Sequence, residues 1–443
     1  MANIPDPQEL AARGRTYAVR GEFALAIDSF TEAINLDPRQ PGFFFDRGTC
    51  LSAIGDMAAA VADFDEAIRL NPINASYFHN RGSARVDAEE FEAALVDFDE
   101  AIRLDPDDPE ALNGRGVAKA RHGDNDGALA DFTAAIELEP TAGTIYFNRG
   151  NTHCVLGRID DAIADYTAAV KHSPFHARAF LYRGTMYHSA GDLAQAIADY
   201  STALRIDGND QEAYFHRARA FADLENFDAA LSDLDRGLKV APDWPELLNL
   251  RGVIRARRGQ HQEARSDFNQ AVLLAPEMAS VRFNRGLSAF QTEDYEAALA
   301  DFNSAIELDP EHAPALNLRA AVHYRRDDRA AAIADHEAGL AIDPTDARAH
   351  NHLAWLLATA PEDHLRDGPS AVAHAEAACE LVDYEGASYL DTLAAAHAEC
   401  GQFEEAVKWQ QKALEQFDGA DRSTYAARLE LYRAGKPYRD QPQ

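Results

Sequence analysis

The sequence is poor in cysteine and has no long hydrophobic run. No segment approaches the roughly 18 consecutive apolar residues that a membrane-spanning helix needs, so we expect no transmembrane segment. The four cysteines, Cys50, Cys154, Cys379 and Cys400, are scattered without the spacing of a metal site. Cys50 and Cys154 are expected as small core residues. These scarcities predict a protein of the reducing cytoplasm.

Positive charge is scarce as well. Arginine and lysine together number 42 against 74 acidic residues, and only six of the 42 are lysines. A chain with a formal net charge of −32 repels nucleic acids and anionic membranes at long range, so we expect neither as a partner. The first ten residues, MANIPDPQEL, lack the charged and apolar parts of a secretory signal, which also favours a cytoplasmic location.

The motifs of enzyme and metal sites are missing too. The closest histidine pairs, His172 with His176 and His350 with His352, match no zinc-protease motif and have no cysteine pair nearby. No glycine-rich loop suits a phosphate, and no nucleophile stands beside an evident base. We therefore expect no catalytic residue, no metal site and no cofactor.

What the sequence does contain is a strict period of 34 residues, marked by proline. Gly208, another helix breaker, occupies the one slot that proline skips. The nine prolines on this period are Pro38, Pro72, Pro106, Pro140, Pro174, Pro242, Pro276, Pro310 and Pro344. Such a period predicts stacked helix–turn–helix units, none of which buries its apolar face alone.

Other positions of the unit repeat as well. With the proline at position 32, position 8 is glycine in eight of ten repeats, and position 20 is alanine in all ten. Position 24 carries phenylalanine, tyrosine or leucine, with His336 as the one exception. Small residues let two helices approach, and the large side chain at position 24 fills the space beside them.

This pattern resembles the tetratricopeptide repeat over nearly the whole chain, in the manner of bacterial multi-repeat arrays. The resemblance implies an all-α, right-handed superhelical solenoid of about twelve helix–turn–helix repeats. We predict ten contiguous repeats over residues 7–346, two atypical repeats over 347–419, and a capping helix with a short tail over 420–443. The turn at 361–370 is longer than elsewhere, and its partner helix is expected to begin near Ala371. We interpret these last repeats as structural, since terminal repeats are commonly atypical.

Two further positions carry opposite charges. Position 7 is arginine in all ten repeats: Arg13, Arg47, Arg81, Arg115, Arg149, Arg183, Arg217, Arg251, Arg285 and Arg319. Position 23 is aspartate in nine repeats and Ser29 in the first. Because a planar guanidinium binds a carboxylate through two donors, we predict a ladder of partly buried pairs, within repeats or between successive ones. We expect these pairs to specify the stacking register.

The family resemblance also implies where a partner binds. In tetratricopeptide repeats, the first helix of each repeat lines a concave groove through positions 2, 5, 6, 9, 12 and 13. Asparagines there can bind a peptide backbone, and aromatic rings can supply apolar contact. The predicted groove residues are Phe45, His79, Asn80, Asn113, Phe147, Asn148, Asn151, Phe215, Arg219, Asn249, Phe283, Asn284 and Asn317. Packing between adjacent repeats explains any one of them equally well.

The sequence therefore predicts a protein-interaction scaffold that captures a peptide or helical segment of an unidentified protein. No lysine occupies the groove positions, which argues against the family's carboxylate clamp for chaperones. Two alternatives stay open. One is self-assembly, with Arg428, Arg433, Lys436 and Arg439 docking against an acidic face of a second copy. The other is a regulatory arm of an enzyme complex whose catalysis lies on another chain.

Overall fold

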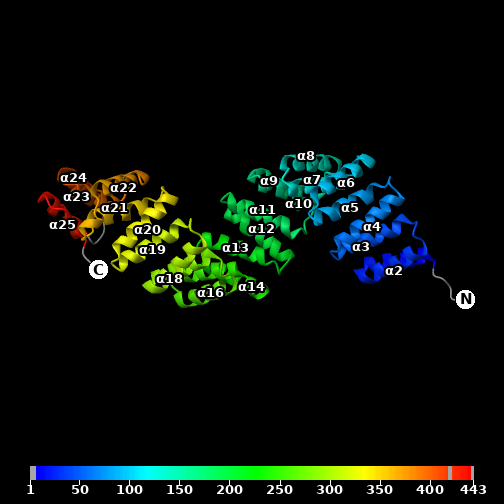
Figure 1. The fold of residues 1–443 in the computed structure, drawn as a ribbon, viewed down its shortest axis with the longest axis horizontal. Helices are drawn as coiled ribbons and strands as arrows, with labels where there is room; N and C mark the ends of the chain where they lie inside the picture. The colour runs from blue at the N-terminus through cyan, green and yellow to red at the C-terminus, as the bar shows by residue number, and fades with distance from the viewer. Residues whose placement is uncertain (1–5, 418–421, 441–443) are drawn as a thin grey trace. The chain divides into compact units, whose positions relative to one another are not determined.

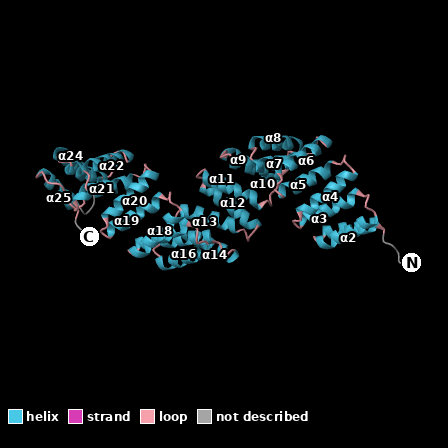
Figure 2. Ribbon diagram, viewed as in Figure 1, coloured by secondary structure: helices cyan, strands magenta, loops and turns pink. Residues whose placement is uncertain are grey.

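The computed structural model describes residues 6–417 and 422–440, and all secondary structure in these ranges is helical (Figure 2). The chain forms two compact bodies, the first ending at Asn226 and the second beginning at Phe227. The first body holds α1 (Pro7–Val19), α2 (Phe23–Leu36), α3 (Pro41–Ala53), α4 (Met57–Leu70), α5 (Ala75–Asp87), α6 (Phe91–Leu104), α7 (Pro109–His122), α8 (Asn125–Leu138), α9 (Gly143–Val155), α10 (Ile159–His172), α11 (Ala177–Ser189), α12 (Leu193–Ile206) and α13 (Gln211–Asp223).

The second body holds α14 (Phe227–Val240), α15 (Pro245–Arg257), α16 (His261–Leu274), α17 (Ala279–Gln291), α18 (Tyr295–Leu308), α19 (Ala313–Arg325), α20 (Arg329–Ile342), α21 (Ala347–Thr359), a short 3-10 helix (Asp363–Leu365), α22 (Gly368–Leu381), α23 (Ala387–Glu399), α24 (Phe403–Gln416) and α25 (Arg422–Arg433). Within each body, consecutive helices pack as hairpins, such as α3 with α4 and α23 with α24 (Figure 1). The predicted all-α solenoid of helix–turn–helix repeats is confirmed.

The turn inside most hairpins contains one residue with a positive φ angle. Glycine supplies it in many repeats, as at Gly21 (φ 75°) and Gly157 (φ 69°). Where the repeat has no glycine at this position, an acidic residue takes the same conformation, as at Glu89 (φ 61°) and Asp327 (φ 65°). Both residue types therefore provide the left-handed conformation that ends the first helix.

The hairpin core is built from the small and large residues of the repeat. Ala60 is fully buried and the Phe64 ring is 1% exposed. A Cβ atom placed on Gly48 would lie 2.9 Å from the Phe64 ring, so only glycine permits this approach of the two helices. The two repeats with alanine instead of glycine, at Ala218 and Ala320, have leucine and histidine at position 24 in place of a phenyl ring.

The predicted arginine–aspartate ladder is confirmed, and the pairs lie within repeats. In each pair the arginine Nε and Nη2 donate to the two carboxylate oxygens at 2.5–3.0 Å. The pairs are Arg47–Asp63, Arg81–Asp97, Arg115–Asp131, Arg149–Asp165, Arg183–Asp199, Arg251–Asp267, Arg285–Asp301 and Arg319–Asp335. In the first repeat, Arg13 donates to Ser29 at 3.2 Å.

The same arginines also reach the preceding repeat. Nη1 of Arg81 donates to Asp65 at 2.5 Å, and Nη1 of Arg285 donates to Asn269 at 2.8 Å. The acceptor is always the residue sixteen positions earlier, on the second helix of the repeat before. Each such guanidinium therefore joins two successive second helices and supports the stacking register.

The last repeats differ from the sequence expectation in one boundary. Helix α22 begins at Gly368, three residues before the predicted Ala371, because Asp367 caps it and accepts the Ser370 amide at 3.2 Å. A proline in the first turn also suits a helix start. The predicted boundary between residues 419 and 420 lies outside the described residues.

Candidate peptide-binding groove

All thirteen predicted groove residues lie on first helices, and each is half-buried. The first body holds Phe45, His79, Asn80, Asn113, Phe147, Asn148, Asn151, Phe215 and Arg219, and the second body holds Asn249, Phe283, Asn284 and Asn317. They are therefore distributed over two bodies, and within each body the structure brings some of them together.

The asparagines pair with one another across adjacent first helices. Asn148 on α9 donates to Asn113 on α7 at 2.9 Å. Asn284 on α17 donates in the same way to Asn249 on α15 at 3.0 Å. Each bond uses one of two amide protons and one of two carbonyl lone pairs, so further donors and acceptors remain for a ligand.

Other predicted polar residues have local partners. Asn80 donates to the Ser76 carbonyl of its own helix at 2.8 Å, and Asn151 accepts from the Tyr166 hydroxyl at 2.8 Å. Arg219 lies 3.4 Å from His188 Nδ1.

His79 stands apart from this group. Its Nδ1 atom is buried without a hydrogen-bond partner. Burial lowers the pKa of His79, so the ring is a neutral contact at pH 7.

The predicted aromatic residues pack between successive repeats. The Phe147 ring stacks on Tyr182 of the next first helix with centroids 5.6 Å apart. The ring centroids of Phe45 and Tyr77 lie 5.0 Å apart, and those of Phe283 and His312 lie 4.7 Å apart. These rings therefore support the stack and also present their remaining surface on the first-helix face.

In the second body, the first helices enclose two adjoining cavities. One, of about 370 Å³, includes the predicted residues Phe283 and Asn317 in its wall. The other, of about 510 Å³, extends from Phe290 on α17 to Arg428 on α25. Both are lined by Leu318, Ala321, His336 and His352, so they form one continuous groove along α17, α19, α21 and α23.

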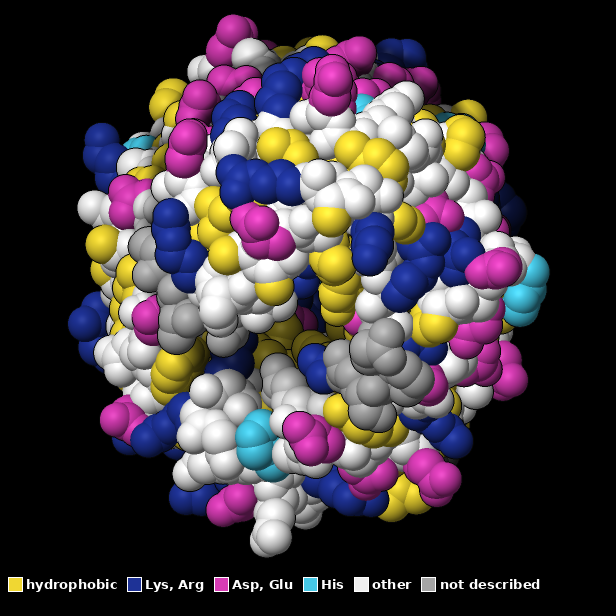
Figure 3. Space-filling view, turned by 90° about the vertical axis from the view of Figure 1, so that its left-hand side faces the viewer, with side chains coloured by type: hydrophobic (Ala, Val, Ile, Leu, Met, Phe, Trp, Pro, Cys, Tyr) yellow, Lys and Arg dark blue, Asp and Glu magenta, His cyan; other side chains and the backbone are white. Residues whose placement is uncertain are grey.

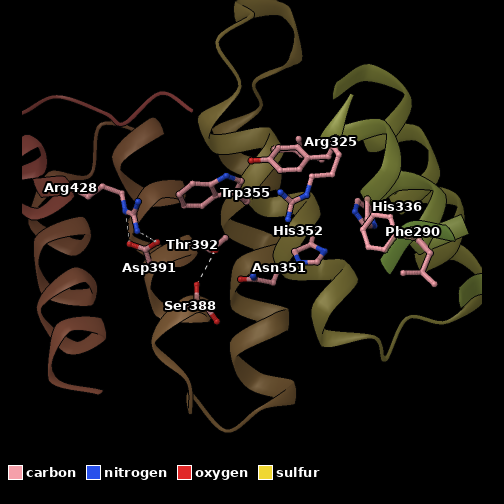
Figure 4. A pocket seen from close by; sticks show the side chains of 14 residues that line it. Phe290, Arg325, His336, Asn351, His352, Trp355, Ser388, Asp391, Thr392 and Arg428 are labelled. Atoms are coloured by element: carbon pink, nitrogen blue, oxygen red, sulfur yellow. Dashed lines mark hydrogen bonds and ion pairs between the residues drawn. The ribbon is translucent and has the colours of Figure 1, made fainter. Parts of the chain in front are cut away.

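The larger cavity combines an aromatic wall with a buried ion pair (Figure 4). Arg428 donates to both Asp391 oxygens at 2.8 and 2.7 Å, and its guanidinium lies 5.4 Å from the Trp355 ring. Burial raises the pKa of Asp391, while the charge of Arg428 opposes that rise. Gln410 adds a third hydrogen bond to Asp391 at 2.7 Å, which compensates the buried carboxylate further.

Besides the cation Arg325, the wall contains polar side chains that are uncharged at neutral pH. Burial lowers the pKa of His336 to about 3 and lowers the pKa of His352 as well, so both imidazoles are neutral. The Asn351 Oδ1 atom is buried without a hydrogen-bond partner. A wall of apolar surface with a few convergent hydrogen-bonding groups is typical of sites that bind small molecules or peptide side chains.

Most of the larger cavity was missed by sequence reasoning, because the period slips after residue 346 and the groove positions were mapped only up to that point. Continuing the same numbering places Asn351 at position 5, His352 at position 6 and Trp355 at position 9. The unusual His336 at position 24 was a second available signal, since it lines both cavities.

The structure corrects the self-association hypothesis for one of its four cations. Arg428 is only 6% exposed and is paired with Asp391, so it cannot dock against a second copy. Arg433 pairs with Glu430 and Arg439 with Glu399.

On the end of the molecule shown in Figure 3, hydrophobic side chains line a hollow that charged side chains of both signs surround.

Models of the tetratricopeptide repeat match residues 11–75, 79–143, 147–211, 187–254, 279–312 and 387–415. The chain belongs to the tetratricopeptide repeat family. It is a protein–protein interaction scaffold, and members of this family generally bind proteins or peptides and are generally not enzymes. None of the curated proteins matches the chain.

Solved structures resemble the chain only distantly. A tetratricopeptide repeat protein from Parabacteroides merdae is 21% identical, with 55% of this chain and 97% of that chain covered and a TM-score of 0.47. A chain of the APC/C hetero-tetramer Cut9–Hcn1 is 16% identical, with 79% of this chain and 96% of that chain covered and a TM-score of 0.45. YrrB, described as a protein with an unusual peptide-binding site, is 23% identical, with 42% of this chain and 95% of that chain covered and a TM-score of 0.33. With TM-scores below 0.5, these likenesses do not indicate a partner.

Two further properties concern only the residues that the structure describes. None of the helices there is both long and apolar enough to cross a membrane. In the same residues, no three or more histidine, cysteine, aspartate or glutamate side chains gather as a metal site would require.

Proposed function

We propose that the chain binds an extended or helical peptide segment of another protein along the face of its first helices. The observation that carries this proposal is the continuous groove of the second body, where two cavities share Leu318, Ala321, His336 and His352. The groove is lined mainly from positions 5, 6, 9 and 12 of successive first helices, and a peptide that crosses them would meet one set of contacts per repeat.

Of the thirteen predicted residues, Phe283 and Asn317 belong to this groove, and the other eleven remain the proposed contacts outside it. The division into repeats at 7–346, 347–419 and 420–443 and the cytoplasmic location are likewise predictions. Phe147, Phe215 and Phe283 supply half-buried aromatic surface at the same repeat position, and the asparagines beside them keep spare hydrogen-bonding capacity. A partner segment therefore needs apolar side chains for these rings, and it needs hydrogen-bonding groups for the asparagines, which the backbone of an extended segment or the polar side chains of a helical one can supply.

The test begins with peptides selected from a random library against the intact protein. Ala321 lines both cavities, so Ala321→Phe should fill the groove without removing a core contact. We expect at least tenfold weaker binding of the selected peptides. The matched control is Ala338→Phe, an exposed position on the second helix α20, which should bind as the wild type does.

A second variant tests the phenylalanines at position 5 of three repeats. Phe147, Phe215 and Phe283 are changed together to alanine, and Leu25, Val96 and Leu273, which are exposed on second helices, are changed to alanine as the control. Unchanged peptide binding by both Ala321→Phe and the phenylalanine variant, at wild-type helix content, would reject the first-helix face as the binding site.

A further inference from the structure

The chain returns to its own first helices after the last helix. Behind α25 it turns at Gly435, whose φ angle is 66°, and residues 436–440 have no regular secondary structure. We call residues 434–440 the tail segment. Pro437 restricts both itself and Lys436 to extended conformations, so this stretch cannot continue the helix.

The tail segment is held by a main-chain bond and by its side chains. The Asp440 amide donates to the Thr359 carbonyl at 2.8 Å. Thr359 is the last residue of α21, where carbonyls have no partner within the helix. The Tyr324 hydroxyl donates to the Asp440 carboxylate at 2.5 Å.

The two residues before Asp440 make separate contacts. Arg439 lies 2.7 Å from the Glu399 carboxylate at the end of α23. The Tyr438 ring packs on Trp355 with centroids 5.7 Å apart, and the Arg428 guanidinium lies 5.3 Å from the same ring. Three consecutive tail residues therefore contact α19, α21 and α23.

These contacts use the repeat positions that face a ligand in this fold. Trp355 stands at position 9 and Tyr324 at position 12, while Thr359 and Glu399 stand at position 13 of their repeats. Tyr324, Trp355 and Arg428 also line the larger cavity, so the tail segment lies directly beside it.

We propose that Tyr324, Trp355, Thr359 and Glu399 form a binding site for an extended peptide in which an aromatic residue, a basic residue and an acidic residue follow one another. The tail segment is the resident ligand of this site, with Tyr438, Arg439 and Asp440 in those three roles. A segment of another protein with the same chemistry replaces it and can extend into the adjoining cavity. The inference deepens the proposed function, on which it rests for the idea that first helices receive extended segments.

Competition with the tail segment sets the affinity that a partner reaches. A covalently attached ligand has an effective concentration on the order of millimolar. The fraction of molecules with an open site is correspondingly small, and the apparent dissociation constant of a partner rises by the inverse of that fraction. Releasing the tail segment should therefore strengthen binding on the order of ten- to a hundredfold.

The experiment uses the full chain and a labelled synthetic peptide, AGKPYRDQPQ, which has the sequence of residues 434–443. Its binding is measured by fluorescence anisotropy to the wild type and to the full-length double variant Tyr438→Ala, Asp440→Asn. We expect at least tenfold tighter binding to the double variant. A peptide with the same two substitutions should bind the double variant no more tightly than it binds the wild type. The control variant Arg433→Ala, which changes an exposed residue of α25, should bind the unmodified peptide as the wild type does.

A second measurement keeps the chain unmodified, in case the double variant does not fold. Hydrogen exchange in the wild-type fragment that spans α25 and the tail segment should increase when excess peptide is added. Equal peptide affinity of wild type and folded double variant, or unchanged exchange, would overturn the proposal and leave the tail segment as a structural cap. A dimer of the wild type that the double variant loses would also overturn it and assign the site to a second copy.

The two proposals fail separately. Loss of library-peptide binding in Ala321→Phe with no tail-peptide effect supports the groove alone. Tail-peptide binding that is insensitive to Tyr324→Phe and Trp355→Ala, while the groove variants behave as expected, rejects only the site described here.

Discussion

Arg149 and Asp165 form a two-point hydrogen bond across one hairpin, with Nε and Nη2 of the arginine at 2.9 and 2.7 Å from the carboxylate oxygens. The third nitrogen of Arg149 donates to Thr133 of the preceding repeat at 3.0 Å. Asp165 is 5% exposed, so its charge depends on this arginine for compensation. One side chain thereby holds both the hairpin and its neighbour.

Arg149→Lys should lower the free energy of unfolding of the first body by about 2 kcal/mol, because an ammonium cannot donate from two fixed directions to one carboxylate and still reach Thr133. Urea denaturation followed by circular dichroism measures the change. As a control, Arg103→Lys alters a pair with Glu100 that is exposed on one helix, and the midpoint should stay where it is. Equal midpoints for wild type and Arg149→Lys would contradict the role of the ladder.

Gly252→Ala should destabilise the second body by about 2 kcal/mol, because the new Cβ would lie 2.7 Å from the Phe268 ring. Adding Phe268→Leu should recover much of the loss, since a repeat with alanine at position 8 already has Leu234 at position 24. Thermal unfolding measures both variants. The control Gly42→Ala has open space around it and should be neutral or slightly stabilising, so a loss of similar size there would refute the steric explanation.

The second body should lose stability as the pH falls below about 6.5, where an unfolded histidine becomes protonated. Burial lowers the pKa of folded His336 to about 3. Between about pH 6.5 and about pH 3 the unfolded chain therefore binds more protons than the folded chain, and the free energy of unfolding decreases as the pH decreases. At pH 5 protonation of His336 in the unfolded chain should lower the free energy of unfolding by about 2 kcal/mol relative to pH 7.

Above pH 6.5, His336 is neutral in both states and contributes no pH dependence. His336→Leu should therefore weaken the pH dependence of the urea midpoint between pH 7 and pH 5. His352 keeps a part of it, because burial lowers its pKa too. If the variant loses as much stability as the wild type over this interval, His336 is not the group responsible.

Arg428→Ala should destabilise the second body by about 3–5 kcal/mol, because it leaves the Asp391 carboxylate buried without its ion partner. Asp391→Leu combined with Arg428→Met should cost much less, since both charges are removed together. A double-mutant cycle of Asp391→Leu and Arg428→Met, measured by urea denaturation, gives the coupling energy between the two side chains. Independent, additive effects of the two single changes would show that the pair does not act as a unit.

The sequence by itself determined the repeat, the hairpins, the small and large core positions and the charged residues of the ladder, because each of these recurs at a fixed position of the 34-residue unit. It left open whether each arginine binds the aspartate of its own repeat or of a neighbouring one. The structure showed that Arg149 binds Asp165 of its own repeat and Thr133 of the preceding repeat, each sixteen residues away. Sequence alone left open whether the groove asparagines face a ligand or one another. Only the structure showed that Asn148 meets Asn113.

The cavity of the second body and the path of the tail segment were decided by tertiary structure alone. Tyr324 meets Asp440 across 116 residues, a contact that occurs once and has no periodic counterpart. It depends on where α25 ends, on the longer turn after α21 and on the Thr359 carbonyl left without a helical partner. Contacts of this kind leave no repeated signature, because they form only after the repeats have stacked.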